Sequence, residues 1–140
     1  MATFNKFNCF VENLAEKVHN LGADTLKILL TNTAPNVSTN TVKADLTEIS
    51  AGNGYTAGGA TVTITSSAQS GGVYKLVGND PVITAAGGSI GPFRYAVLYN
   101  STAAGGPLIG YWDYGSSITL NDTEPLTIDL DGVNGILQLT

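Results

Sequence analysis

Two neighbouring runs of sequence decide the fold: IGPFRYAVLYN (Ile90–Asn100) and LIGYWDYGSSITL (Leu108–Leu120), joined by a segment rich in small residues. Successive side chains of a strand point to opposite faces. In the first run this alternation groups Phe93, Tyr95, Val97 and Tyr99. In the second run it groups Leu108, Trp112 and Tyr114, with Tyr111 on the other face. We therefore expect a β-hairpin with an aromatic core, in which Trp112 is buried.

The composition of the rest of the chain favours an all-β fold. Charged residues make up 12% of the 140 residues, about half of the usual share, and glycine occurs 17 times. Short apolar alternations such as Leu26–Leu30 and Leu126–Leu130 are separated by turn-forming clusters. We expect a single domain over residues 1–140, an antiparallel β-sandwich or jelly roll with one N-terminal α-helix.

Two segments lie outside this strand pattern. Apolar residues recur at spacings of three and four near the N-terminus, which predicts an amphipathic helix over about residues 5–20. Long loops cover about residues 32–59, where a compact eight-stranded fold needs only short connections. We expect these two segments to contact a partner protein. The predicted contact residues are Phe4, Phe7, Val11, Asn36, Val37, Asn53 and Tyr55.

No motif in the chain predicts catalysis. His19 is the only histidine and therefore the only candidate histidine base, and we expect it to be a structural helix residue. The lone Cys9 has no partner for a disulfide or a metal site. The glycines of Gly52–Gly59 lack the spacing of a phosphate loop. Asp129 and Asp131 resemble half of a calcium loop, but a turn explains them better. We expect no enzyme activity, no cofactor and no metal.

The charge pattern argues against nucleic-acid and membrane partners. The net charge is −5, and the six basic residues are scattered singly, so no basic surface is predicted. No apolar run approaches the 18 residues of a membrane span, and the N-terminus lacks a secretory pattern. We expect a protein that is made in the cytoplasm.

Several motifs together resemble those of small virion proteins of tailed bacteriophages. They include NKF with CFVE near the N-terminus, LAEKVHNL, LTNTAP, AGNGY, GPFRY and YWDYGSSI. The chain is most similar to capsid cement, or decoration, proteins of the Bordetella podophage type. The resemblance implies a jelly-roll protein without enzyme activity on the outer surface of an icosahedral head. Its implied partner is a major capsid protein of the HK97-like fold, and a symmetric homodimer would grip two capsid subunits at once.

Two other functions remain open at this point. The chain could be a tail or baseplate component, or a carbohydrate-binding module on the virion that stacks sugars on Tyr111, Trp112 and Tyr114. The exposure of Trp112 discriminates between these functions, because a sugar platform needs an indole face that is open to water. An enzyme is the least favoured reading, because the chain offers so few candidate bases.

Overall fold

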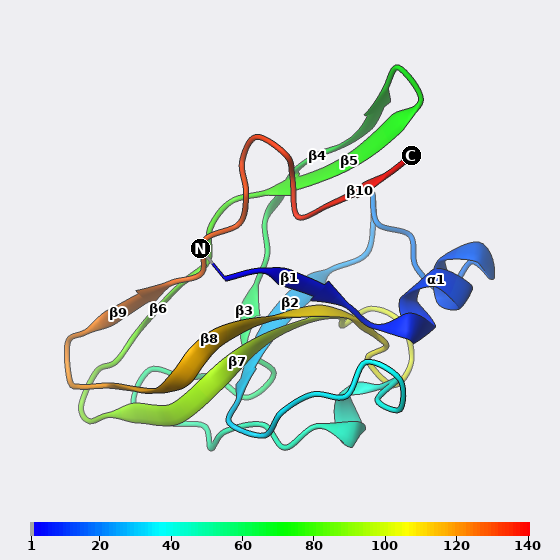
Figure 1. The fold of residues 1–140 in the computed structure, drawn as a ribbon. Helices are drawn as coiled ribbons and strands as arrows, with labels where there is room; N and C mark the ends of the chain where they lie inside the picture. The colour runs from blue at the N-terminus through cyan, green and yellow to red at the C-terminus, as the bar shows by residue number, and fades with distance from the viewer. Residues whose placement is uncertain (1) are drawn as a thin grey trace.

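The computed structural model describes residues 2–140 (Figure 1). Strands account for 45% of the chain and helices for 8%. The paired strands are antiparallel, so the predicted all-β architecture with a single N-terminal α-helix is confirmed. The elements in chain order are β1 (Phe4–Lys6), α1 (Asn8–Ala15), β2 (Leu26–Thr31), the 3-10 helix η1 (Lys43–Asp45), β3 (Ala60–Thr61), β4 (Ile64–Ser70), β5 (Val73–Gly78), β6 (Val82–Thr84), β7 (Ile90–Asn100), β8 (Leu108–Leu120), β9 (Pro125–Thr127) and β10 (Leu137–Leu139).

The main sheet has five strands in the order β1-β8-β7-β2-β3, and the aromatic hairpin β7–β8 lies at its centre. The register of this hairpin is irregular between Phe93 and Tyr95 and again beside Tyr99. A bulge reverses the faces of the residues that follow it. Phe93 therefore packs on the opposite face from Tyr99, and Leu108 on the opposite face from Trp112. These two placements correct the face assignments expected from strict alternation.

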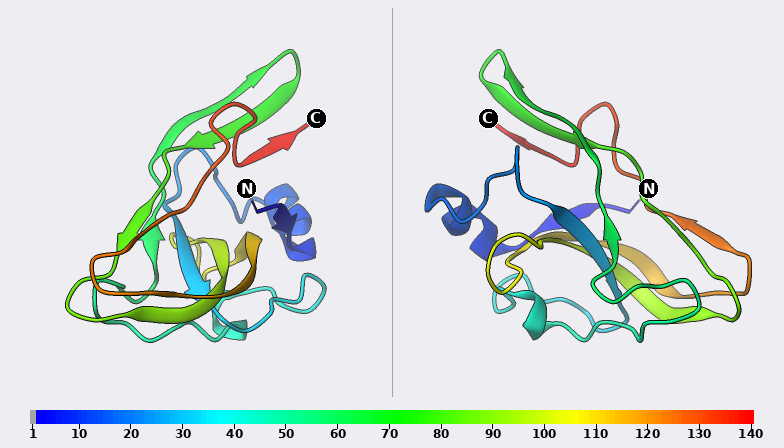
Figure 2. Two further views of the ribbon diagram at one scale, coloured as in Figure 1. Left: turned by 60° about the vertical axis from the view of Figure 1, so that its left-hand side comes forward. Right: turned by 180° about the vertical axis from the view of Figure 1, so that it is seen from behind.

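The larger core lies between the main sheet and the two smaller sheets, β10-β5-β4 and β6-β9. Figures 1 and 2 show β6 and β9 beside one end of the hairpin β7–β8, and β4, β5 and β10 rising away from it. Trp112 belongs to this core and is only 5% exposed. Its predicted burial is confirmed, and Tyr114 packs against the same core.

A second, smaller core covers the other face of the main sheet. It is formed by Phe7, Leu29, Val97, Tyr99 and Leu108, with Val37 and Leu46 packed against it. The latter two residues belong to the long segment that follows β2, which runs along this face (Figure 1). The predicted loops 32–59 therefore cover one face of the sheet with apolar contacts from Val37 and Leu46.

Hydrogen bonds fix the glycine-rich end of this cover. The carboxylate of Glu48 accepts bonds from the Tyr55 hydroxyl at 2.7 Å and from the backbone N–H of Gly58 at 2.6 Å. The Tyr55 hydroxyl in turn accepts from the backbone N–H of Leu30 at 3.1 Å. The hydroxyl of Tyr99 donates to the carbonyl of Gly58. The glycines thus let the backbone approach two buried phenols, which is a structural use.

The N-terminal segment differs from the expected helix over residues 5–20. Phe4 lies in β1, which pairs with β8, and α1 contains eight residues. The backbone N–H of Val18 donates to the carbonyl of Asn13, and Lys17 has a φ of 69°, so the helix has ended there. Leu21 is buried although it lies in an irregular segment after the helix, and its burial extends the apolar spacing beyond the end of α1.

Candidate protein-binding surface

The hairpin of β4 and β5 projects beyond the rest of the molecule in all three views (Figures 1 and 2). Its turn is Gly71-Gly72, with φ values of 61° and 83°. Positive φ at both positions is what a two-residue hairpin of type I′ needs, and glycine adopts it without strain. The turn closes the pair Ser70 and Val73, which sets the register of the whole hairpin.

One edge of this hairpin is unprotected. Within residues 2–140, β4 pairs only with β5, and all of its residues after Ile64 are exposed. The sequence contains no charged residue between Glu48 and Lys75. Proteins usually guard a free edge with charges, proline or a covering loop, because an open edge can pair with another strand. The edge of β4 has a bulge at its base but no charge and no proline, which makes it a candidate docking site for a strand.

The base of the hairpin is anchored firmly. Leu76 on β5 and Ile136 before β10 are both buried in the larger core. The ammonium group of Lys75 donates to the carbonyl of Val133 at 2.9 Å, and β10 pairs along β5. Gly78 leaves room for Val62, whose Cγ1 would be 2.9 Å from a Cβ at position 78. The exposed edge is therefore held on a fixed support.

A groove of about 600 Å³ separates this hairpin from the end of α1. Leu14 and Val18 line one side, and Tyr74 and Leu139 line the other. Val18 and Leu139 are 38% and 37% exposed, so each side of the groove presents apolar surface. The buried ring of His19 also lines this groove.

The predicted contact residues divide into three groups in the structure. Phe7 and Tyr55 are buried, so the structure corrects their assignment as partner contacts. Phe4 and Val37 are half-buried against the two cores. Val11 on α1, and Asn36 and Asn53 in the long cover, are exposed and remain available to a partner. Asn53 already donates to the carbonyl of Ser89 at 3.0 Å. The predicted residues therefore do not form one surface.

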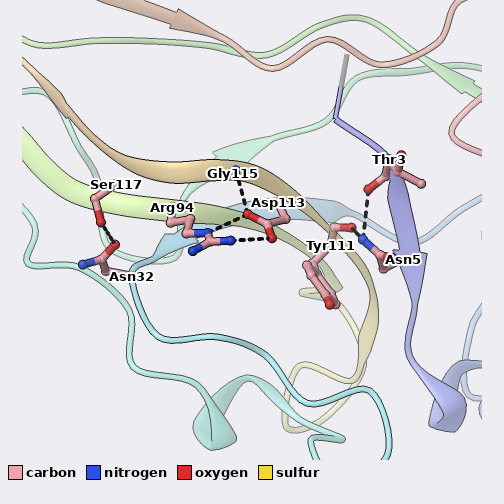
Figure 3. Close-up of polar contacts among 8 residues, drawn as sticks. All are labelled: Thr3, Asn5, Asn32, Arg94, Tyr111, Asp113, Gly115 and Ser117. Carbon is pink, nitrogen blue, oxygen red and sulfur yellow. Dashed lines mark hydrogen bonds and ion pairs between the residues drawn. The ribbon is translucent and has the colours of Figure 1, made fainter.

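The outer side of the aromatic hairpin is occupied by its own polar contacts (Figure 3). Arg94 on β7 reaches across to Asp113 on β8, with an Nε–Oδ1 distance of 2.8 Å and an Nη2–Oδ2 distance of 3.1 Å. The Arg94 guanidinium, helped by the backbone N–H of Gly115, holds the pKa of Asp113 below its usual range. Figure 3 also shows Ser117 donating to Asn32, and these bonds tie strands and cover together.

The acidic turn before β10 is held by hydrogen bonds between its own residues. The carboxylate of Asp131 accepts bonds from the backbone N–H groups of Val133 and Asn134 and from the Asn134 side chain. These hydrogen bonds, the backbone bond from Asn134 first, lower the pKa of Asp131. A turn over Asp131–Gly135 is confirmed, because the Gly135 N–H donates to the Asp131 carbonyl at 2.9 Å. The expected hairpin is wrong, because β9 and β10 on either side of the turn belong to different sheets.

Among residues 2–140, no group of three or more His, Cys, Asp or Glu side chains could hold a metal ion. No helix in the same range has the length and apolar character needed to cross a membrane. In comparisons with known proteins, no family model, curated protein or solved structure matched this chain.

Proposed function

We propose that this chain is a non-enzymatic structural protein of a bacteriophage virion, which binds the outside of an icosahedral head and braces neighbouring major capsid proteins of the HK97-like fold. The motif resemblance suggests this role, and the free edge of β4 on its anchored hairpin supports it. A brace acts by binding an assembled lattice, which stabilises that lattice by mass action without chemistry. An exposed strand edge on a rigid base offers such binding.

The same edge supports a homodimer. Antiparallel pairing of β4 with β4 of a second copy joins two three-stranded sheets into one sheet of six strands. Each copy carries a net charge of −5, but β4 and its turn contribute none of it. The two edges therefore meet without like charges opposite each other. The exposed residues Val11 and Asn36 then remain free for the capsid.

The burial of Trp112 argues against a carbohydrate-binding module. The indole is 5% exposed and its ring packs against Phe4, so it has no open face for a sugar. The remaining alternative, a tail or baseplate component, differs from the proposed head protein in its binding site on the virion.

The test compares two variants in co-sedimentation with heads assembled from the major capsid protein of the same phage. Ala68→Glu adds a charge to the β4 edge, opposite Lys75, so the hairpin itself keeps a favourable cross-strand pair. Thr61→Glu is the matched control, because it adds the same charge on β3, opposite Lys27.

We expect the unmodified protein and Thr61→Glu to sediment as dimers and to decorate assembled heads, but not free capsid subunits. Ala68→Glu should sediment as a monomer and lose most of the decoration, because two binding sites act together in the dimer. If unmodified protein fails to bind heads, the proposed function is wrong. If Ala68→Glu decorates heads as well as Thr61→Glu, the β4 edge is not the dimer contact.

A further inference from the structure

The only histidine of the chain is buried with one of its ring nitrogens paired. His19 is 5% exposed and lies in the segment 16–25 between α1 and β2. Its ring packs against Phe10 with centroids 5.3 Å apart. Nδ1 is 3.1 Å from Nδ2 of Asn100 at the end of β7, whereas Nε2 is buried and has no hydrogen-bond partner among residues 2–140.

The amide of Asn100 has a fixed orientation. Its Oδ1 accepts bonds from the backbone N–H groups of Thr102 at 3.0 Å and Ala103 at 3.2 Å, and a backbone N–H can only donate. The other amide atom is therefore the nitrogen. It donates to Oδ2 of Asp24 at 2.6 Å, and it faces Nδ1 of His19. Asp24 Oδ2 also accepts from the backbone N–H of Asn20 at 2.9 Å.

This orientation determines which nitrogen of the neutral His19 imidazole carries the proton. A donor faces Nδ1, so Nδ1 must be the unprotonated acceptor and the proton of neutral His19 must be on Nε2. Protonation of Nδ1 places two donors 3.1 Å apart. Rotation of the Asn100 amide gives no relief, because it would turn the amide oxygen toward Asp24 and the NH₂ group toward two backbone N–H groups.

The same network holds three parts of the chain together. Thr102 Oγ1 accepts from the backbone N–H of Thr25 at 2.8 Å, and the backbone N–H of Ser101 donates to the Thr25 carbonyl at 2.9 Å. Segment 16–25 also lies against the β4–β5 hairpin, since a Cβ at Gly22 would be 3.2 Å from the Ser67 hydroxyl. We propose that His19 is an acid-sensitive switch, whose protonation releases segment 16–25 from the β7–β8 connection and loosens α1. This inference does not depend on the proposed function.

The charged and titratable groups around the ring place the titration of His19 on the acidic side of its ordinary pKa. Asp24 and Lys17 of segment 16–25 and Tyr74 of β5 line the same groove. Of these three, Asp24 joins the network. Burial lowers the pKa of His19, and the Asp24 carboxylate opposes this shift only in part. Hydrogen bonds from the Asn20 backbone and the Asn100 amide lower the pKa of Asp24, so it stays ionised while His19 titrates.

The lowered pKa of His19 makes the protein less stable in acid. The folded protein binds the His19 proton less readily than the unfolded chain does, for which the pKa is about 6.5. The contribution to stability is therefore complete above about pH 6.5 and is lost as the pH falls toward the lower pKa of the folded state. Each unit of difference between the two pKa values corresponds to about a tenfold change in the folding constant.

The first measurement is a long-range ¹H–¹⁵N NMR spectrum of the isolated protein, in which a single histidine gives unambiguous signals. At pH 7.5 we expect Nδ1 as the unprotonated nitrogen and Nε2 as the protonated one. On acidification the ring should titrate below pH 6.5, and backbone amides of residues 16–25 should exchange with solvent faster than those of β7. A proton on Nδ1 at pH 7.5, or a pKa above 6.5, would overturn the proposal.

The second measurement is the melting temperature between pH 8 and pH 5. His19→Phe keeps a ring against Phe10 but cannot titrate, and His19→Asn places an acceptor oxygen where Nδ1 lies. We expect the unmodified protein to lose stability on acidification through this range, and both variants to lose markedly less. Glu16→Gln is the control for an exposed charge in the same segment and should follow the unmodified protein. Parallel pH profiles for all four proteins would refute the switch.

Discussion

The indole of Trp112 packs against the ring of Phe4, with centroids 5.0 Å apart and ring planes inclined by 52°. The two residues are direct partners in the pairing of β1 with β8. Gly110, two residues before Trp112, makes room for this contact, because a Cβ there would overlap the Phe4 ring. The N-terminal strand therefore closes one side of the core tryptophan.

Trp112→Ala should lower the free energy of unfolding by roughly 3 to 5 kcal/mol, because it leaves a large cavity in the main core. Phe4→Ala should cost less, because Phe4 is only half-buried, but it should expose the indole. Denaturant titration measures both changes. Trp112 is the only tryptophan, so its emission reports on this site alone.

We expect the emission of the native protein to be that of a buried indole, and Phe4→Ala to shift it toward longer wavelength. Val133→Ala is the control, since Val133 is 78% exposed and should change neither stability nor emission. Native emission like that of a water-exposed indole would contradict the packing.

Two neighbouring residues of α1 test which side of the helix is core. Phe10 is 1% exposed and Val11 is 53% exposed. Phe10→Ala should destabilise by roughly 3 to 5 kcal/mol, whereas Val11→Ala should stay within about 0.5 kcal/mol. Thermal or denaturant unfolding distinguishes them. Equal effects would mean that α1 is not docked as described.

At the N-terminus, the apolar spacing of the sequence predicts that a helix exists but does not predict where the helix begins and ends. An N-terminal helix exists, and Phe7 of the predicted apolar spacing is buried. The spacing also placed Val11 on the apolar face and left out Phe10, whereas Val11 is exposed and Phe10 is buried. The pattern could not separate a strand at Phe4 from a helix that begins at Asn8, because three- and four-residue spacings continue through both. Removal of residues 1–20 would delete β1 and two core phenylalanines, so it is not a test of partner binding alone.

The packing of the long loops over residues 32–59 could not be predicted from the sequence either. Segments without alternation are normally assigned to the surface, but Val37, Leu46 and Tyr55 pack on or under the sheet. Val37 and Leu46 pack on a second apolar face of β2, β7 and β8, which the bulges of the β7–β8 hairpin create, whereas Tyr55 belongs to the larger core. The β4 edge is marked in the sequence by the absence of charge between Glu48 and Lys75, which is a property of the surface and not of any catalytic motif.

Chelation provides a test of the acidic turn. The Asp131 carboxylate accepts three hydrogen bonds within its own turn, so the turn needs no cation to hold its shape. We expect EDTA to leave the melting temperature unchanged, and Asp131→Ala to lower it whether or not calcium is present. A drop of several degrees with EDTA that calcium reverses would instead assign a cation to Asp129 and Asp131.

Two glycines with positive φ, Gly59 and Gly71, are needed for different reasons. At Gly59 a side chain has no space, whereas at Gly71 only the left-handed backbone conformation disfavours one. Gly59 has a φ of 84°, and a Cβ there would overlap the carbonyl oxygen of Ile28, where β3 meets β2. Gly71 has a φ of 61° in the β4–β5 turn, and a Cβ there would meet nothing within 4 Å.

Gly71→Ala should therefore cost only the left-handed backbone, about 1 to 2 kcal/mol, whereas Gly59→Ala adds a clash with the main sheet and should cost roughly 3 kcal/mol or more. Denaturant unfolding of the two variants at one pH measures the difference. Gly59→Ala should also expose Tyr55 and Tyr99, because it pushes the glycine-rich loop away from the sheet, and near-ultraviolet circular dichroism would detect that change. Equal destabilisation by the two variants would mean that the backbone of β3 does not lie against Ile28.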